Sequence, residues 1–577
     1  MESVVQTVGA LEAVVLRAFG PHGGQVLFTR DTGQAMLSRS GARILTALRL
    51  DNPLARIIVD CASRHSARTG DGSKSFILLL ASLVRKIKCA ACTDQQMSLS
   101  YPSRACSKAR CLADELLSFS LHHLDNVLGV GVLPYTQCLM WDEVHAALPC
   151  PVQKLLSAFF HTRLSQNHCS FISGLLCELL SNWTIKDNQP YSSLQFLNDS
   201  WPALYTPVVG FPIVYSRLLE GQVIHRDFAI PSTQTAQGPV KAIVLTSPLH
   251  PKFIEAGETL EIGGKGDILH FSSFAESSLE CVISYLCSLG VSVLLSSVKQ
   301  PAVVLALAAQ ACISVVECIS QEDLDLFIHL SEATAVSGFW NIQSKHVVSL
   351  AFCKAAVLGA HRYVHVGFPD KQDLKPCSLV VCGAGEGQTE QHALAMLDAI
   401  RMLLTTWQPP TSAQPERNSS ITSNCPPRHP NCPQGCVLTA GGTFEFLLSH
   451  SLQNNSAPRH TYMISCILAD SLLCLPRLIY SHKPLHFVQI QSKVIKRTHT
   501  SPMSSESSIN VGSECCIQES GLESVFCKYQ LLLAVLQCVS QLFRIDSVIH
   551  TRRRLKTIAN ISCKEEEREE EEEQVEE

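Results

Sequence analysis

The residues best placed to do chemistry form a glycine-rich segment, Thr69-Gly70-Asp71-Gly72-Ser73-Lys74-Ser75. Two glycines permit sharp backbone turns, and apolar residues recur at helical spacing from Phe76 to Ile87, so the segment is expected to open a helix. The first amides of a helix lack intrahelical partners and, with the helix dipole, attract anions. Asp71 adds a hard oxygen of the kind that holds Mg²⁺ against phosphates. The segment therefore predicts phosphate binding.

This segment is not a Walker-type P-loop, although Lys74 suggests one. Ser73 separates Gly72 from Lys74, and Ala67 stands where that motif needs its first glycine. Asp51-Asn52-Pro53 predicts a helix start before the loop, whereas a P-loop follows a strand. The expected order of helix, loop and helix excludes a Walker site.

Two earlier glycine turns divide the first elements of the chain. An amphipathic helix from Val4 to Phe19 runs into Gly20-Pro21-His22-Gly23-Gly24, and Ser40-Gly41 precedes another helix. Between them, Val26–Phe28 and Ala35–Leu37 have the pattern of a hairpin. Loops of this kind wrap around phosphate chains, and they also form ordinary surface turns, so spacing alone leaves both interpretations open.

Composition favours a folded chain of several domains. The chain has 577 residues, of which 46% are hydrophobic and 17% charged, so three or four domains are expected. The net charge is −5, which implies no basic face and no nucleic-acid partner. The longest apolar run, 302–316, contains Gln310 and is shorter than the ~18 residues that span a bilayer. No transmembrane segment is therefore expected.

The 26 cysteines are scattered among apolar residues, and no signal peptide opens the chain, so reduced thiols in the cytosol are expected. Two groups have a spacing that approaches that of zinc ligands. They are Cys89, Cys92, Cys106 and Cys111, and Cys425, His429, Cys432 and Cys436. The first pair ends an apolar helix and prolines flank most of the second group, so zinc is the less favoured interpretation.

From Pro207 onward, strands and helices alternate, which predicts an α/β layered domain. The expected strands are 242–245, 291–295 and 313–316, with helices at 279–289 and after Pro301. Before this region 155–183 is mostly helical, and after it a strand at 379–383 precedes a helix at 392–403. The segment 408–434 is rich in proline and serine and is expected to be a linker.

Several motifs occur in the order found in one known family. Four glycine motifs resemble the glycine loops of the group II chaperonins: Gly20-Pro21, Ser40-Gly41-Ala42, Gly70-Asp71-Gly72-Ser73 and Ala440-Gly441-Gly442. The segment 542–549 resembles the closing motif of the same family. These are ATP-driven folding machines of archaea and the eukaryotic cytosol. The segments 56–61 and 296–301 are most similar to the chaperonin-like Bardet–Biedl syndrome proteins. The resemblance extends from about Val4 to Ile549.

The resemblance implies a multi-domain α+β fold with a mostly helical equatorial domain, a small intermediate domain and an α/β apical domain. The implied bounds are 1–145 and 436–563 for the equatorial domain, 146–206 and 351–407 for the intermediate domain, and 207–350 for the apical domain. An insert at 408–435, a polar insert at 492–515 and an acidic tail at 564–577 complete the chain.

The resemblance also implies an ATP site with Mg²⁺ held by Asp71. The nucleotide-binding residues would be Gly20, Pro21, Gly41, Gly70, Asp71, Gly72, Ser73, Lys74, Ser75, Gly441 and Gly442. Asp398 stands where the family places a hydrolytic aspartate. Ser40 replaces a second aspartate, and a hydroxyl cannot serve as that base, so ATP binding with slow or negligible hydrolysis is expected.

The implied function is that of a chaperone that binds ATP and assists assembly of the ciliary BBSome trafficking complex, in support of ciliogenesis. Partners would be other chaperonin-like Bardet–Biedl proteins, the cytosolic chaperonin and BBSome subunits as clients. The implied locations are the cytoplasm and the basal body region of the cilium. The alternative is a scaffold that keeps the fold without using ATP.

Overall fold

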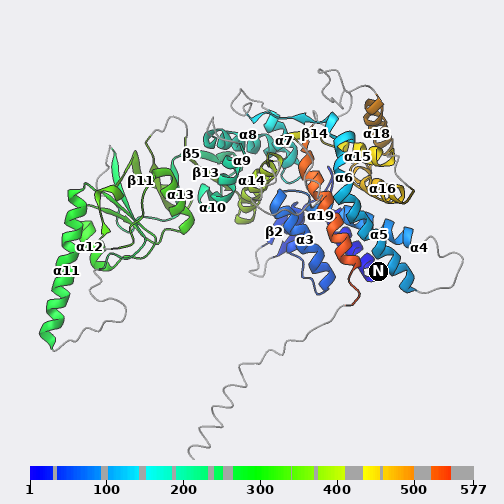
Figure 1. The fold of residues 1–577 in the computed structure, drawn as a ribbon. Helices are drawn as coiled ribbons and strands as arrows, with labels where there is room; N and C mark the ends of the chain where they lie inside the picture. The colour runs from blue at the N-terminus through cyan, green and yellow to red at the C-terminus, as the bar shows by residue number, and fades with distance from the viewer. Residues whose placement is uncertain are drawn as a thin grey trace, which may run out of the picture.

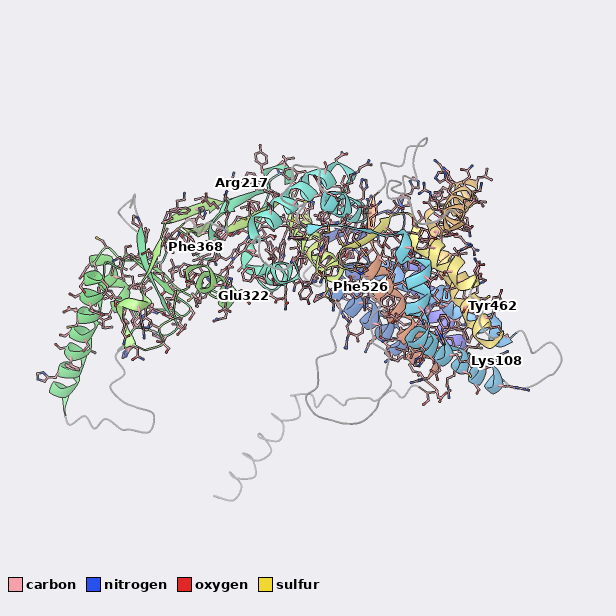
Figure 2. All side chains as sticks on the ribbon, turned by 45° about the horizontal axis from the view of Figure 1, so that its top comes forward. Lys108, Arg217, Glu322, Phe368, Tyr462 and Phe526 are labelled. Atoms are coloured by element: carbon pink, nitrogen blue, oxygen red, sulfur yellow. The ribbon has the colours of Figure 1, made fainter. Side chains whose placement is uncertain are left out.

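The chain extends from a helical region at one end to an α/β region at the other in the computed structural model (Figure 1). The structure describes residues 1–577 except 30–34, 93–101, 142–150, 185–189, 232–238, 251–263, 339–340, 370–374, 410–432, 455–458, 500–520 and 548–577. Side chains fill the space between the ribbons along the whole length (Figure 2). In that view Lys108 and Tyr462 lie at the helical end, and Phe526 lies nearer its junction with the middle region.

The helical region is built from the two ends of the chain. Its first elements are α1 (Glu2–Leu16), β1 (Val26–Thr29), β2 (Ala35–Ser38), α2 (Gly41–Thr46), α3 (Pro53–Thr69), α4 (Ser73–Cys92), α5 (Pro102–His122), α6 (Leu124–Gly131), η2 (Leu133–Tyr135) and β3 (Gln137–Cys138). Its later elements are β14 (Cys436–Thr439), α15 (Thr443–Gln453), α16 (Arg459–Leu472), α17 (Cys474–Ile479), α18 (Pro484–His499), β15 (Leu522–Ser524) and α19 (Val525–Phe543). One hydrophobic core contains residues of both sets.

Local sequence explains the helices that carry the glycine loops. The Asn52 side chain accepts a hydrogen bond from the Leu54 amide, and Pro53 follows it, so α3 begins with a capped turn. Gly70 ends α3 in the left-handed conformation, at φ 68°. Helix α4 is buried on nearly every side from Phe76 to Val84, which is why that stretch has a nearly continuous apolar run. The predicted hairpin forms as the antiparallel pair of β1 and β2.

Strand β14 joins the two halves of the helical region and forms the sheet order β15-β14-β3. Strand β3 leaves the region and β14 re-enters it, and the two pair antiparallel with Cys436 opposite Cys138. The described helices and strands between these two strands belong to the middle and α/β regions. The chain therefore enters and leaves the helical region side by side.

The middle region contains a three-stranded sheet of order β4-β13-β5, on which the long helix α14 packs. Its elements are α7 (Pro151–His161), α8 (Gln166–Trp183), α9 (Pro190–Asp199), α10 (Trp201–Leu204), β4 (Tyr205–Val209), η4 (Ile213–Tyr215), β5 (Arg217–Glu220), β13 (Cys377–Gly383) and α14 (Glu386–Thr406). Their apolar side chains form a second core. Helix α14 also contacts α3 and α19, so it touches the helical region.

The α/β region confirms the predicted alternation of strands and helices. Its main sheet has the order β10-β7-β8-β9, with β7, β8 and β9 parallel. Its elements are β6 (Gln222–Ile224), β7 (Val240–Leu245), α11 (Lys265–Ser288), β8 (Val293–Ser296), α12 (Ala302–Gln310), β9 (Ser314–Val316), α13 (Gln321–Ser331), η6 (Ser344–His346), β10 (Val348–Leu350), β11 (Phe352–Leu358) and β12 (His361–Gly367). A second sheet of order β11-β12-β6 lies beside it.

Two helices lie in segments whose polar composition predicts irregular structure, namely a loop at about 93–110 and the polar insert at 492–515. Helix α5 begins at Pro102, and α18 continues to His499, inside the predicted polar insert 492–515. Each has a narrow buried stripe: Ala105, Ala109, Leu112 and Leu116 in α5, and Ile490 and Val494 in α18. Charged and polar residues on the solvent side of these helices make the helical spacing of the apolar residues hard to recognise in the sequence. The rest of that insert, the predicted linker and the acidic tail lie outside the described residues.

Helix α11 is longer than the sequence pattern indicated, because it starts at Lys265 rather than near Leu279. The buried residues Leu279, Ile283 and Leu286 lie in its second half, and the first half extends away from the sheets in Figure 1. Phe274 in that first half is 60% exposed. The apolar pattern therefore identified only the part of the helix that packs.

Two helical stretches of the described residues are long and apolar enough to cross a membrane by length and composition alone. They are Tyr462–Ile479 and Val525–Phe543, of which 56% and 61% are buried inside the structure. The bent pair α5 and α6 meets the same criteria when taken together. The expected absence of a transmembrane segment stays a prediction.

Candidate functional site

Direct contacts connect the three glycine loops of the first 75 residues. The Lys74 ammonium, at the start of α4, donates a hydrogen bond of 3.0 Å to the Ala18 carbonyl of the first loop. A Cβ on Gly41 would lie 2.4 Å from Lys74 Cγ and 2.7 Å from Ser73 Oγ. Only glycine permits this close approach of the second loop to the third. The loops therefore meet around Lys74.

The third loop also meets α14, which carries Asp398. A Cβ on Gly70 would lie 1.8 Å from the Asp398 carbonyl oxygen, so the backbones of α3 and α14 touch at this point. Gly72 has φ 85°, and its own Cβ position lies 2.9 Å from His65 Nε2. The structure therefore places the predicted hydrolytic aspartate beside the predicted phosphate loop, although the two are more than 300 residues apart in the sequence.

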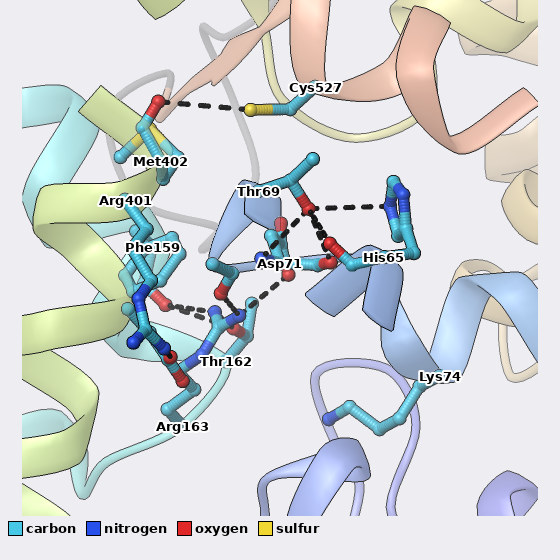
Figure 3. A network of polar contacts seen from close by, with 12 residues as sticks. His65, Thr69, Asp71, Lys74, Phe159, Thr162, Arg163, Arg401, Met402 and Cys527 are labelled. Atoms are coloured by element: carbon cyan, nitrogen blue, oxygen red, sulfur yellow. Dashed lines mark hydrogen bonds and ion pairs between the residues drawn. The ribbon is translucent and has the colours of Figure 1, made fainter. Parts of the chain in front are cut away.

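Arg163, which follows α7, is the central side chain of this site (Figure 3). Its guanidinium donates to Asp71 Oδ1 at 2.7 Å and to the Gly70 carbonyl at 2.9 Å. It also donates to the Phe159 carbonyl at 3.3 Å and to Thr162 Oγ1 at 3.0 Å, and it stacks 3.7 Å from the Phe159 ring centroid. Only 10% of the side chain is exposed. Arg163 is thus a fixed cation beside the third glycine loop.

The charges around Arg163 shift the pKa values of its neighbours. Burial by itself raises the pKa of Asp71, but the charge and hydrogen bond of Arg163 outweigh it, so the pKa is lowered and the carboxylate is ionised. Burial, together with the positive charges of Arg163 and Arg39, lowers the pKa of Lys74 to about 8. These shifts indicate a concentration of positive charge that an anion would relieve.

Two further arginines of the second loop have unused donors. Arg39 Nε and Arg43 Nη1 are buried without a hydrogen-bond partner among the described residues. Arg43 forms an ion pair of 2.7 Å with Glu390 on α14. Arg39 is close enough to Lys74 for its charge to act on the pKa of that lysine. A buried donor without an acceptor is costly, and a phosphate oxygen is a suitable acceptor. The residues present therefore fit a phosphate group.

Burial changes the pKa of the Asp398 carboxyl group. Burial raises its pKa to about 6, although Arg163 and Arg401 act in the opposite direction. Arg401, one turn further along α14, lies 3.6 Å from Asp398 Oδ1. A carboxylate with a pKa near 6 is ionised at pH 7 and is basic enough to accept a proton from water. The geometry is compatible with the predicted hydrolytic role, which stays a prediction.

Asp398→Asn is expected to stabilise the protein at pH 7.5 by about 2–3 kcal/mol, because the buried aspartate must ionise in the folded state at a cost. Its pKa is raised from 3.8 to about 6 on folding, so the cost develops as the pH rises between those values. The stabilisation should therefore shrink below pH 6 and vanish near pH 4. Thermal unfolding of both proteins across this range measures it. Asp60→Asn, at an exposed pair with Arg64, is the control, and an equal response of the two variants would contradict the assignment.

The glycines of the last predicted loop lie in the same region. Gly441 and Gly442 have φ values of 105° and 95° and lead into α15. The Tyr480 hydroxyl donates to the Gly441 carbonyl at 2.9 Å. Two residues later His482 packs edge-on against His22 of the first loop, with ring centroids 5.2 Å apart. The re-entry loop is thereby connected to the first glycine loop through the α17–α18 turn.

A buried cluster of one lysine and two glutamates lies close enough to the third loop for the charge of the lysine to act on Asp71. Lys528 on α19 forms ion pairs of 2.8 Å with Glu445 and 3.3 Å with Glu523. Its positive charge also contributes to the lowered pKa of Asp71. Sequence reasoning missed both Lys528 and Arg163, because each is a single basic residue outside any motif. The sequence feature that could have identified them is a single basic residue within an otherwise apolar segment.

Magnesium fits this arrangement less well than phosphate does. The predicted ligand Asp71 already has one oxygen bonded to Arg163, so a metal at that oxygen would have to displace the guanidinium. No group of three or more His, Cys, Asp or Glu side chains within the described part of the chain is arranged to hold a metal. Cys89 and Cys92 end α4, Cys106 and Cys111 lie on α5, and Cys425, His429 and Cys432 lie outside the described residues.

Comparison with known proteins identifies the relatives of this chain. Residues 11–99 and 160–411 match the model of the TCP-1/cpn60 chaperonin family. The matched segments include all three glycine loops of the first 75 residues, Arg163 and Asp398. The chain is also 18% identical to thermosome subunit alpha of Archaeoglobus fulgidus over 94% of this chain and 91% of that protein.

Two relatives are similar over nearly their whole length. The BBSome complex assembly protein BBS10 of Homo sapiens is 26% identical, over 98% of both chains. The mouse protein of the same name is 25% identical, over 98% of this chain and 99% of its own. The similarity is therefore spread over the whole chain and is not limited to the glycine loops.

Proposed function

Because this chain belongs to the TCP-1/cpn60 chaperonin family, we propose that it is an ATP-binding, chaperonin-like protein that assists the assembly of a protein complex. The observation that carries the proposal is the meeting of three glycine loops around Lys74, with Arg39, Arg43 and Arg163 beside them. Backbone amides at the start of α4 and several cations in one place suit a triphosphate. The family relationship supplies the expectation that this ligand is ATP.

We propose that this complex is the BBSome, because the names of relatives that match this chain over 98% of its length describe them as BBSome complex assembly proteins. Its subunits would be the clients, and other chaperonin-like Bardet–Biedl proteins and the cytosolic chaperonin would be partners. The corresponding locations are the cytoplasm and the basal body region of the cilium. Support comes from the whole-length similarity to those relatives, which includes the α/β region as well as the glycine loops.

Hydrolysis in this proposal is slow. Asp398 is the acid available to activate water beside Gly70, and Arg401 lies within ion-pair distance of it. Ser40, at the start of α2, provides no second carboxylate. Loss of one general base costs roughly 10²- to 10⁴-fold in rate. Nucleotide occupancy, rather than rapid turnover, is then the state that would regulate client binding.

Wild-type protein is expected to bind radiolabelled ATP, and Lys74→Gln is expected to weaken binding at least about tenfold, since a hydrogen bond from a charged group contributes ~1.5–3 kcal/mol. Lys86→Gln is a matched control, because Lys86 lies further along the same helix and pairs with Asp470 at the surface, at 2.8 Å. Equilibrium binding of the three proteins measures the difference, and it should appear again as a loss of BBSome assembly in cells that depend on the variant.

These binding and assembly measurements distinguish a chaperone that uses ATP from a scaffold that does not. If wild-type protein binds no ATP, or if Lys74→Gln and Lys86→Gln bind it equally, the nucleotide site is not where we place it. If Lys74→Gln loses ATP but supports assembly fully, the chain acts as a scaffold that does not use nucleotide.

A further inference from the structure

We propose that Arg163 takes the place of a divalent metal at Asp71, so that this site binds the phosphate chain of a nucleotide without Mg²⁺. The inference rests on the proposed ATP binding and concerns how the phosphate charge is neutralised. It departs from the sequence-based expectation of Mg²⁺ held by Asp71. The observation behind it is the ion pair between Arg163 and Asp71 at the third glycine loop (Figure 3).

Arg163 is held too firmly to be a chance neighbour of Asp71. Besides the carboxylate, the guanidinium is bonded to the Gly70 carbonyl of the same loop and to the carbonyl of Phe159, whose ring lies against it. These contacts fix it from two segments, α7 and the third loop. Only 10% of the Arg163 side chain is exposed, against 47% of the Asp71 side chain. Moving the guanidinium to admit a metal would break this ion pair and the hydrogen bond to the Gly70 carbonyl.

Three acidic side chains near the loops, among the residues that the structure describes, lie beside an arginine. Asp71 pairs with Arg163, Asp398 lies 3.6 Å from Arg401, and Glu390 on the preceding turns of α14 pairs with Arg43. A magnesium ion needs carboxylate or phosphate oxygens that are free of other cations. Among the described residues, each of these three carboxyl groups therefore already has an arginine within ion-pair distance, and a divalent ion would have to enter beside those positive charges.

The same cations suit a phosphate chain. An arginine is always charged and presents several donors in a planar fork that matches phosphate geometry. Arg163 is at the third loop, Lys74 at the junction of all three, and Arg39 and Arg43 at the second loop have buried donors without a hydrogen-bond partner in the described residues. Together they can balance the charge that Mg²⁺ balances elsewhere. Nucleotide affinity should then be independent of magnesium.

The primary test compares the affinity of wild-type full-length protein for ATP in excess EDTA and in excess Mg²⁺. The two dissociation constants are expected to agree within about threefold, a difference that corresponds to less than one order of magnitude in affinity. A dissociation constant at least about tenfold higher in EDTA would overturn the proposal while leaving ATP binding intact. Failure to bind ATP under both conditions would instead remove the proposed function on which it rests.

Two variants sharpen the comparison. Asp71→Asn removes the negative charge and frees Arg163, so affinity in EDTA should increase about three- to tenfold, whereas loss of a metal ligand would decrease affinity in Mg²⁺. Arg163→Gln exposes Asp71, so binding should fall about tenfold or more in EDTA and recover in part when Mg²⁺ is added. A decrease for Asp71→Asn in Mg²⁺, or no change of metal dependence for Arg163→Gln, contradicts the inference.

Arg85→Gln is the matched control for these variants. Arg85 lies on α4 and makes two hydrogen bonds to Glu12, far along the helix from the glycine loops. Like Arg163→Gln, the Arg85→Gln variant replaces an arginine and removes one positive charge, but it lies outside the site. The effect of Mg²⁺ on its ATP affinity should therefore equal that in wild type. Circular dichroism of each variant verifies that the helices are retained before binding is measured.

Discussion

Gly70→Ala is expected to lower the free energy of unfolding by about 3 kcal/mol or more, because the added methyl group meets two separate penalties. The residue has φ 68° at the end of α3, a conformation that costs an L-amino acid about 1–2 kcal/mol. Its Cβ would also lie 1.8 Å from the backbone oxygen of Asp398. Neither backbone can yield without separating α3 from α14, and overpacking of that kind costs about 1–3 kcal/mol more.

Gly9→Ala provides the matched control for that substitution. Gly9 lies inside α1, and a Cβ there would meet no atom within 4 Å. Alanine in a helix interior is more favourable than glycine by about 0.5–1 kcal/mol, so this variant should be slightly stabilised. Thermal unfolding of both variants measures the contrast. If Gly70→Ala unfolds at the same temperature as Gly9→Ala, the close contact between α3 and α14 does not exist in solution.

Lys528→Met is expected to destabilise the protein by about 3–5 kcal/mol at pH 7.5, because it leaves two buried carboxylates without their cation. Only 2% of the Glu445 side chain and 19% of the Glu523 side chain are exposed. Burial raises the pKa of Glu523 to about 7 even with Lys528 in place. Burial alone would lower the pKa of Lys528, but the two glutamates outweigh it and raise it. Removing Lys528 would therefore leave both carboxyl groups without a counter-charge.

The effect of Lys528→Met should depend on pH. A carboxyl group whose pKa is raised on folding costs stability as the pH rises from its ordinary pKa to the raised value. Without Lys528 neither glutamate has its cation, so lowering the pH from 7.5 to 5 should protonate Glu523 and recover part of the lost stability. Urea unfolding at both pH values measures the change.

Lys86→Met is the control, because the exposed pair of Lys86 and Asp470 contributes only about 0–1 kcal/mol. Both substitutions remove one lysine of an ion pair, so they differ in burial alone. Equal destabilisation by the two variants at pH 7.5 would show that the Lys528 cluster is not buried.

The start and end of several helices and strands could be predicted from the sequence of short segments. Asn52 and Pro53 specify the start of α3, Gly70 specifies its end, and the apolar run after Ser73 specifies α4, because caps and periodicity act within a few residues. The same reasoning predicted the β1–β2 hairpin and the three parallel strands β7, β8 and β9 of the main α/β sheet, but not β10. It failed for α5 and α18, whose buried stripes are narrow and whose other residues are polar. The strand order within each sheet has no local signal and came only from the structure.

The sequence by itself determined that glycine turns precede helices and that Asp71 and Lys74 lie where an anion could bind. Only the tertiary structure decided which charges meet there. Arg163 reaches Asp71 across 92 residues, and Lys528 reaches the glutamates from a different helix. An ion pair forms where packing brings two side chains into one low-dielectric region, and neither residue type nor spacing encodes that meeting. The identity of the cation beside Asp71 is therefore a property of the fold.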